Sequence, residues 1–350
     1  MKFMKFILLF IFIYHLCFQY GAKAQWSSLD EKSHALLTSG IYQVHQEKYN
    51  DAICTFKKLI ECYPNYPIGY FLVAVVYQII MRNYRVKIFE HEFEKYIDLA
   101  IKNGNSIIQQ DKENSLNYFY SGGAYGYRGL HKVRKKEWLG AFFDGKKGIK
   151  YLKLALMKDA ELYDAYYGLG TFHYWLGAKS KFIRYLFSYK GDQQQGIDEL
   201  MLALKKGRYT NIECKYALAA IYYEEKNYNK AMEMNQELHE LFPSNPACLY
   251  MRSRIFEKQC EWEDAKITMQ QLLNQLNASE YNSVGYKVEC HYRIAYYDYK
   301  MGNFELARNG CLKALKLQDK RNSKMELEGP LEDSQQILKQ TNQLCEKVII

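Results

Sequence analysis

Few side chains in this sequence are spaced like a catalytic or metal-binding motif. His91 and Glu92 begin the H-E-x-x-H order of zinc proteases, but Lys95 stands where the second histidine would be. The chain contains neither a G-x-S-x-G nucleophile turn nor a C-x-x-C pair. We therefore expect no enzyme activity, with no catalytic residue, no metal site and no cofactor.

A basic cluster with interleaved aromatic side chains is the strongest charged feature. Such a patch suits nucleic acid, anionic lipid headgroups or an acidic protein face. A solvated helix edge is the simpler alternative, because lysine and arginine commonly occupy exposed positions. The cluster comprises Arg128, Lys132, Arg134, Lys135, Lys136, Lys146, Lys147, Lys150 and Lys153, with Tyr125, Tyr127, Trp138, Phe142 and Phe143 among them.

The N-terminal segment predicts the compartment. Lys2 and Lys5 precede an apolar run from Phe6 to Tyr14, and Ala22-Lys23-Ala24 provides an A-x-A cleavage site. An uncleaved anchor is the alternative, but the run is shorter than the roughly 20 apolar residues that span a bilayer. We expect residues 1–24 to be a signal peptide and the mature protein to be periplasmic or extracellular, at most peripheral to a membrane. An exported protein rarely meets nucleic acid, so we expect no nucleic-acid partner.

Eight cysteines remain after the leader, an even number that makes disulfides worth considering in an exported protein. Cys54 and Cys62 are eight residues apart on one expected helix, about 12 Å along its axis and beyond disulfide reach. We expect most of the cysteines to be small buried helix residues.

Composition and spacing indicate a helical repeat. Hydrophobic residues make up 48% of the 350 residues and prolines number only 5, which excludes wholesale disorder and leaves long helices uninterrupted. Small and large residues recur at Ala52, Phe56 and Pro64; Gly148, Leu152 and Ala155; Gly196, Leu200 and Ala203; Ala231, Asn235 and Pro243; Ala265, Met269 and Leu272; and Ala307, Cys311 and Ala314.

This pattern resembles the tetratricopeptide repeat, a helix pair of about 34 residues in which small residues let the two helices approach closely. The resemblance implies an all-α, right-handed superhelix of antiparallel helix pairs. Residues 25–320 would form the array, with an insertion near 175–195, and residues 321–350 a linker and a capping helix. His173 stands where the repeat places tyrosine, so we expect a packed core histidine.

Several segments depart from the regular period. We expect helices over about 90–109 and 115–133, the second packing closely through Gly122, Gly123, Gly126 and Gly129, and a final helix from Pro330 to about Val348. Glu326 and Glu328, in the polar break before that helix, are expected to be solvated. Residues 116–205 look like a subfamily of exported bacterial tetratricopeptide proteins. They are faintly similar to the eukaryotic inclusion-body-clearance tetratricopeptide family.

The register of the repeat implies which side chains face the concave groove. They are mostly aromatic, which suits extended peptides or apolar ligands, although a tightly wound superhelix would bury them instead. The predicted groove residues are Tyr167, Tyr174, Trp175, Tyr216, Tyr223, Tyr250, Arg254, Tyr292 and Tyr296. We interpret the chain as an exported scaffold that binds protein or peptide segments. The alternative is a protein at a membrane surface that binds lipid or a small apolar ligand through the Phe182–Tyr189 insertion.

Overall fold

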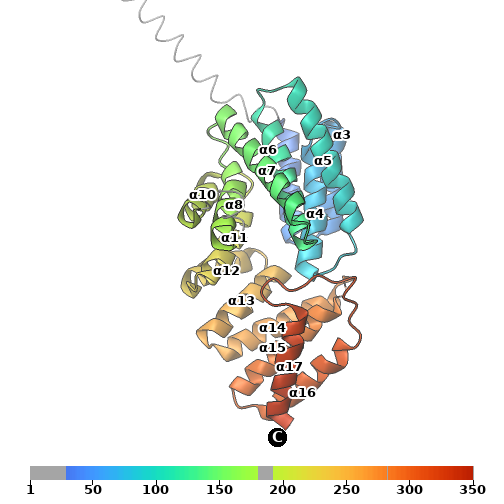
Figure 1. The fold of residues 1–350 in the computed structure, drawn as a ribbon, viewed down its shortest axis with the longest axis vertical. Coiled ribbons are helices and arrows are strands. Elements are labelled where there is room, and N and C mark those ends of the chain that lie inside the picture. The colour runs from blue at the N-terminus through green and yellow to red at the C-terminus, as the bar shows by residue number, and fades with distance from the viewer. Residues whose placement is uncertain (1–28, 180–191, 282, 350) are drawn as a thin grey trace, which may run out of the picture.

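Fourteen helices of the computed structural model form seven successive pairs, and one more helix follows them (Figure 1). The structure describes residues 29–179, 192–281 and 283–349, so the predicted leader and the Phe182–Tyr189 insertion lie outside it. The pairs are α2 (Glu31–His45) with α3 (Tyr49–Cys62), α4 (Ile68–Tyr84) with α5 (Glu90–Gln110), α6 (Ser115–Arg134) with α7 (Trp138–Lys158), α8 (Ala165–Lys179) with α10 (Gln193–Lys206), α11 (Asn211–Glu224) with α12 (Tyr228–Leu241), α13 (Pro246–Gln259) with α14 (Trp262–Ala278), and α15 (Val284–Lys300) with α16 (Phe304–Gln318). Within the described ranges the only β-type pairing is an isolated bridge between Val86 and Glu326. The predicted all-α repeat solenoid is confirmed.

Small residues set the distance between the helices of a pair, as the spacing predicted. A Cβ atom on Gly148 of α7 would lie 3.0 Å from the carbonyl oxygen of Gly122 on α6. A Cβ atom on Gly170 of α8 would lie 2.6 Å from the carbonyl oxygen of Gly196 on α10. The contact at Gly170 is closer than real Cβ atoms approach, and the contact at Gly148 is tighter than most. These backbones therefore lie close together because the side chains are absent.

Five of the pairs share one turn. The first helix ends, one residue takes a positive φ between 61° and 80°, a polar residue follows, and an aromatic residue begins the second helix. Left-handed backbone favours glycine, yet only one of the five turns has it. The turns are Glu47-Lys48-Tyr49, Lys136-Glu137-Trp138, Lys226-Asn227-Tyr228, Cys260-Glu261-Trp262 and Gly302-Asn303-Phe304.

The first helix pair also contacts pairs far along the chain. His45 lies 3.1 Å from Glu213 of α11, and the Gln275 side chain at the end of α14 donates to Glu47 at 2.8 Å. The rings of Tyr49 and Tyr281 are 6.1 Å apart. The array therefore curves tightly enough for its beginning to pack against its later turns.

The last helix, α17 (Ser334–Ile349), packs against α16 and α15. It begins four residues after the predicted start at Pro330, because Asp333 caps it by accepting from the backbone N–H of Gln336 at 2.7 Å. Residues 330–332 form a bend instead, and Glu332 within it makes contacts described in the next section.

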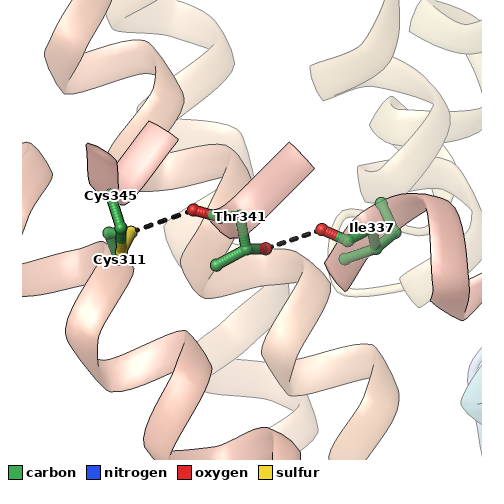
Figure 2. The surroundings of a disulfide bond; sticks show 4 residues. All are labelled: Cys311, Ile337, Thr341 and Cys345. Atoms are coloured by element: carbon green, nitrogen blue, oxygen red, sulfur yellow. Dashed lines mark hydrogen bonds between the residues drawn. A yellow bond between two sulfur atoms is a disulfide. The ribbon is translucent and has the colours of Figure 1, made fainter. Parts of the chain in front are cut away.

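A disulfide joins Cys311 of α16 to Cys345 of α17, with Cα atoms 5.8 Å apart (Figure 2). One turn earlier on α17, the hydroxyl of Thr341 donates to the carbonyl oxygen of Ile337 at 2.7 Å. Five of the eight cysteines that follow the predicted leader are buried, as expected, and two of those five form this disulfide. Of the six that remain free, three are buried and three are exposed; the exposed ones are Cys54, Cys62 and Cys260.

Candidate functional site

The structure brings some of the predicted groove residues together and separates others. Tyr174, Tyr223, Tyr250, Arg254 and Tyr292 are buried, whereas Tyr167, Trp175, Tyr216 and Tyr296 are half-buried. Tyr174 and Trp175 pack edge to face with ring centroids 5.1 Å apart in the α8–α11 core. Tyr216 stacks on His45 of the first pair at 5.8 Å. These contacts are those of packed side chains within a tightly wound array.

The second half of the predicted set lies around Arg254. The Tyr250 hydroxyl donates to Glu289 at 2.8 Å, and the ring of Tyr292 packs at a tilt against that of Tyr296, with centroids 6.2 Å apart. Tyr250 and Arg254 are each 3% exposed. Burial raises the pKa of Tyr223 to about 12, although the positive charge of Arg254 opposes that shift.

Three arginines and three glutamates meet at this place, which we call the Arg–Glu cluster. Arg293 donates to Glu289 at 2.7 Å and to Glu257 at 3.1 Å, and Arg254 also pairs with Glu257. The other members, Arg85 and Glu332, are described below. Burial lowers the pKa of Arg254, but the combined effects of Glu257 and the neighbouring tyrosines outweigh burial, raise the pKa above its usual value and keep the guanidinium charged. Formal charges in the cluster cancel, as buried charges require.

Arg85 joins the cluster from the turn after α4. Its guanidinium pairs with Glu289 at 2.5 Å and lies 3.6 Å from the ring centroid of Tyr286 and 4.7 Å from that of Tyr250. The backbone of Arg85 is left-handed, with φ 54°. This residue therefore ties the second helix pair to α13 and α15 across the array.

The segment between α16 and α17, residues 319–333, covers the cluster, and we call it the C-terminal strap. It runs back from α16 toward the end of α4 before α17 begins (Figure 1). Lys87 donates its backbone N–H to Met325 at 2.9 Å, and Leu327 donates to Arg85 at 2.9 Å. These two bonds flank the single antiparallel bridge between Val86 and Glu326.

Acidic side chains of the strap occupy defined positions. Glu332 accepts from Arg254 at 3.2 Å through one oxygen and from Arg293 at 3.0 Å through the other. Glu326 accepts from the backbone N–H groups of Val284 at 3.1 Å and Gly285 at 2.7 Å, at the start of α15. Glu326 is buried, so the prediction that it is solvated was wrong: the strap folds back and places it at a helix N-terminus, which favours negative charge.

A separate cleft of about 730 Å³ opens where the turn after α2 meets the turns that follow α12 and α14. Inside it, Glu47 accepts from the hydroxyl of Tyr84 and from the amide of Gln275, both at 2.8 Å. Burial raises the pKa of Glu47 to about 7. The two hydrogen bonds lower the pKa, but their effect is smaller than that of burial. The cleft is lined mainly by polar residues, so it gives no support to a small apolar ligand.

The described residues contain no group of three or more His, Cys, Asp or Glu side chains that could hold a metal ion. His173 is buried and lies 2.7 Å from Glu199, as a core histidine would. Within the same ranges, no helix is both long and apolar enough to cross a membrane.

Comparisons with known proteins identify the architecture. No protein-family model matches the chain, and no curated protein does either. Among solved structures, the anaphase-promoting-complex hetero-tetramer Cut9–Hcn1 matches 84% of this chain with TM-score 0.53 and 14% identity. The chain has the tetratricopeptide-repeat fold. It spans 48% of the length of that Cut9–Hcn1 chain, so the likeness concerns the fold alone.

Other similar structures are more distant in shape. The C-terminal part of a TPR repeat-containing protein from Cytophaga hutchinsonii covers 82% of this chain and 97% of its own, with 20% identity and TM-score 0.45. YrrB, described as a TPR protein with an unusual peptide-binding site, covers 62% of this chain and 92% of its own, with 16% identity and TM-score 0.43.

Proposed function

We propose that this tetratricopeptide-repeat chain is a non-enzymatic scaffold that binds acidic, extended protein segments at the Arg–Glu cluster. One observation carries the proposal: an extended segment of the chain itself, the C-terminal strap, already lies there. It is held both by backbone hydrogen bonds beside Arg85 and by the salt bridges of Glu332 to two buried arginines. Strand-like pairing supplies affinity without regard to sequence, and side-chain sites add specificity.

The site suits a glutamate-containing segment for a physical reason. Arg254 and Arg293 each bind one oxygen of the Glu332 carboxylate, and charge-assisted hydrogen bonds of this kind are about twice as strong as neutral ones. With the strap in place, the remaining space beside α15 is about 10 Å³. A partner segment would therefore have to displace the strap rather than bind beside it.

A labelled peptide with the sequence of residues 322–333 tests the proposal by fluorescence anisotropy. The wild-type protein should bind it weakly, because the tethered strap competes at an effective concentration on the order of millimolar. A protein carrying Glu326→Gln and Glu332→Gln holds its own strap less firmly. We expect it to bind the unmodified peptide at least about tenfold more tightly than the wild type does, a difference of about 1.4 kcal/mol.

The matched control changes only the peptide. The same peptide with glutamine in place of Glu326 and Glu332 should bind the protein that carries Glu326→Gln and Glu332→Gln at least about tenfold more weakly. The proposal is contradicted if the two peptides bind this variant equally well. It is also contradicted if the unmodified peptide does not bind the variant although the variant still unfolds cooperatively.

We also propose that the scaffold works outside the cytoplasm. The secretory pattern of residues 1–24 supports export, and the Cys311–Cys345 pair suits an oxidising compartment. The mature N-terminus is expected at Gln25, because Ala22 and Ala24 meet the small-residue requirement of the peptidase. N-terminal sequencing of the protein from its native host checks this, and an intact Met1 in the membrane fraction would refute cleavage.

A further inference from the structure

Helix α7 exposes large apolar side chains near its two ends. Trp138 is 61% exposed, Leu139 69%, Phe143 64% and Met157 78%. At the equivalent turn position, Tyr49 of α3 is buried, and Tyr228 of α12 and Trp262 of α14 are half-buried. Phe304 of α16 is 56% exposed, so the exposed fraction varies from one of these turns to the next. The exposure of Trp138 is therefore not dictated by the turn that it occupies.

Three of these residues share one face of α7 with three lysines. Leu139, Phe143, Lys146, Lys150, Lys153 and Met157 follow each other at spacings of three and four residues, and all six are exposed. The opposite face, which includes Ala141, Gly148 and Leu152, packs against α6. We call the six residues, together with Trp138, the α7 outer face.

The charges on this face are left without acidic partners. The carboxylate of Asp144, on the inner side of α7, binds Arg128 and Lys132, both at 2.7 Å. In the described ranges, no salt bridge involves Lys146, Lys150 or Lys153. The lysines of the α7 outer face therefore present positive charge to whatever lies opposite them.

We propose that the α7 outer face is a membrane-docking surface that binds bilayers containing anionic lipid. Tryptophan, phenylalanine, leucine and methionine insert at the boundary between headgroups and acyl chains, and lysines on the same face attract lipid phosphates. A merely solvated edge would carry the lysines without four large exposed apolar side chains. The sequence of this region is compatible with lipid headgroups, an acidic protein face or a solvated edge. The exposure of the apolar side chains favours the bilayer.

The geometry defines how the protein would lie. The exposed face follows the length of α7, so the helix would lie parallel to the membrane plane, with the apolar residues Trp138, Leu139 and Phe143 inserted and the lysines at headgroup level. This surface is built from residues other than those of the Arg–Glu cluster. The docking therefore adds to the scaffold function and does not depend on it.

Co-sedimentation with vesicles tests the proposal on the mature protein. We expect binding to vesicles of phosphatidylcholine mixed with phosphatidylglycerol, weaker binding at high salt, and little binding to phosphatidylcholine alone. Lys150→Gln combined with Lys153→Gln should lower the affinity for these vesicles about tenfold or more, because the attraction of each lysine to an anionic membrane surface strengthens binding severalfold. Leu139→Ser with Phe143→Ser should also lower it about tenfold, by removing the inserted area.

Two matched variants serve as controls. Lys57→Gln with Lys58→Gln removes two exposed lysines of α3, and Leu241→Ser with Ile267→Ser removes two exposed apolar residues of α12 and α14. Neither control should change vesicle binding. The proposal is overturned if the protein sediments with neither kind of vesicle, which is the result expected if this face binds a protein partner. It is also overturned if the control substitutions reduce vesicle binding as much as the α7 substitutions do.

Discussion

Replacing Arg293 by methionine is expected to lower the free energy of unfolding by about 3–5 kcal/mol. Arg293 is 2% exposed and binds Glu257, Glu289 and Glu332 at once. Without it, the Arg–Glu cluster keeps three carboxylates and only two guanidinium groups, so one buried negative charge is uncompensated. Urea denaturation monitored by circular dichroism measures the change.

The loss should depend on pH in a defined direction. An uncompensated buried carboxylate has a folded-state pKa raised above its unfolded value of about 4.3. Below about pH 4.3 this carboxylate is protonated in both the folded and the unfolded state, so the Arg293→Met protein should be nearly as stable as the wild type. As the pH rises, the carboxylate ionises and the stability of the variant should fall further below that of the wild type. A deficit that stays constant from pH 4 to pH 8 would contradict a purely electrostatic origin.

Two further variants identify the cause. Arg293→Met combined with Glu257→Gln restores charge balance, because Arg85 keeps Glu289 and Arg254 keeps Glu332. The double variant should therefore be more stable than the single one. Lys158→Met, which breaks an exposed pair with Glu113, should cost no more than about 1 kcal/mol.

The regular part of the fold was predictable because it is determined by local spacing. Positions such as Gly148 and Leu152 carry the repeat, and they recur in the sequence at helical intervals. The helix expected over 115–133 is α6. Of its glycines, Gly122 and Gly129 pack closely against α7, whereas Gly123 faces the ring of Phe71 on α4 and a Cβ atom on Gly126 would meet nothing within 4 Å. These features depend only on contacts between residues that are close together in the sequence, within one helix or between consecutive helices.

The Arg–Glu cluster was missed because no local pattern encodes it. Arg85 and Glu289 are 204 positions apart, and Glu332 reaches Arg254 only because the strap turns back toward α4. In the sequence, Glu326 stands in a polar break that is typical of a solvated loop, and Glu332 falls within the helix that was expected to begin at Pro330. The register did identify Tyr250 and Arg254 as facing inward, but spacing alone cannot say whether an inward face is open or filled.

The shared turn between paired helices was also missed, although the sequence carries a signal for it. In each of the five shared turns, an aromatic residue stands two places after the left-handed residue, as in Lys226-Asn227-Tyr228 and Gly302-Asn303-Phe304. Only Gly302 has the residue type that normally marks such a turn. A search for glycine therefore finds one of the five, whereas a search for the aromatic residue finds them all.

Gly170→Leu is expected to destabilise the protein by about 3 kcal/mol, and Gly170→Ala by a smaller amount within the range of about 1–3 kcal/mol. A Cβ atom at this position would lie 2.6 Å from the carbonyl oxygen of Gly196 and 2.9 Å from the backbone nitrogen of Leu200. Both atoms belong to the backbone of α10, which cannot rotate away as a side chain can. Helices α8 and α10 would have to separate, which would loosen the core that contains Tyr174 and Leu218.

Gly126 of α6 provides the matched control for this prediction. It is also a helical glycine of the array, but a Cβ atom there would meet nothing within 4 Å. Gly126→Ala should therefore raise the free energy of unfolding by about 0.5–1 kcal/mol, since alanine loses less conformational entropy than glycine when a helix forms. Thermal melts of the two alanine variants should move in opposite directions. If Gly170→Ala melts at or above the wild-type temperature, then α8 and α10 are not held at backbone contact, and the role assigned to the small residues in this pair is wrong.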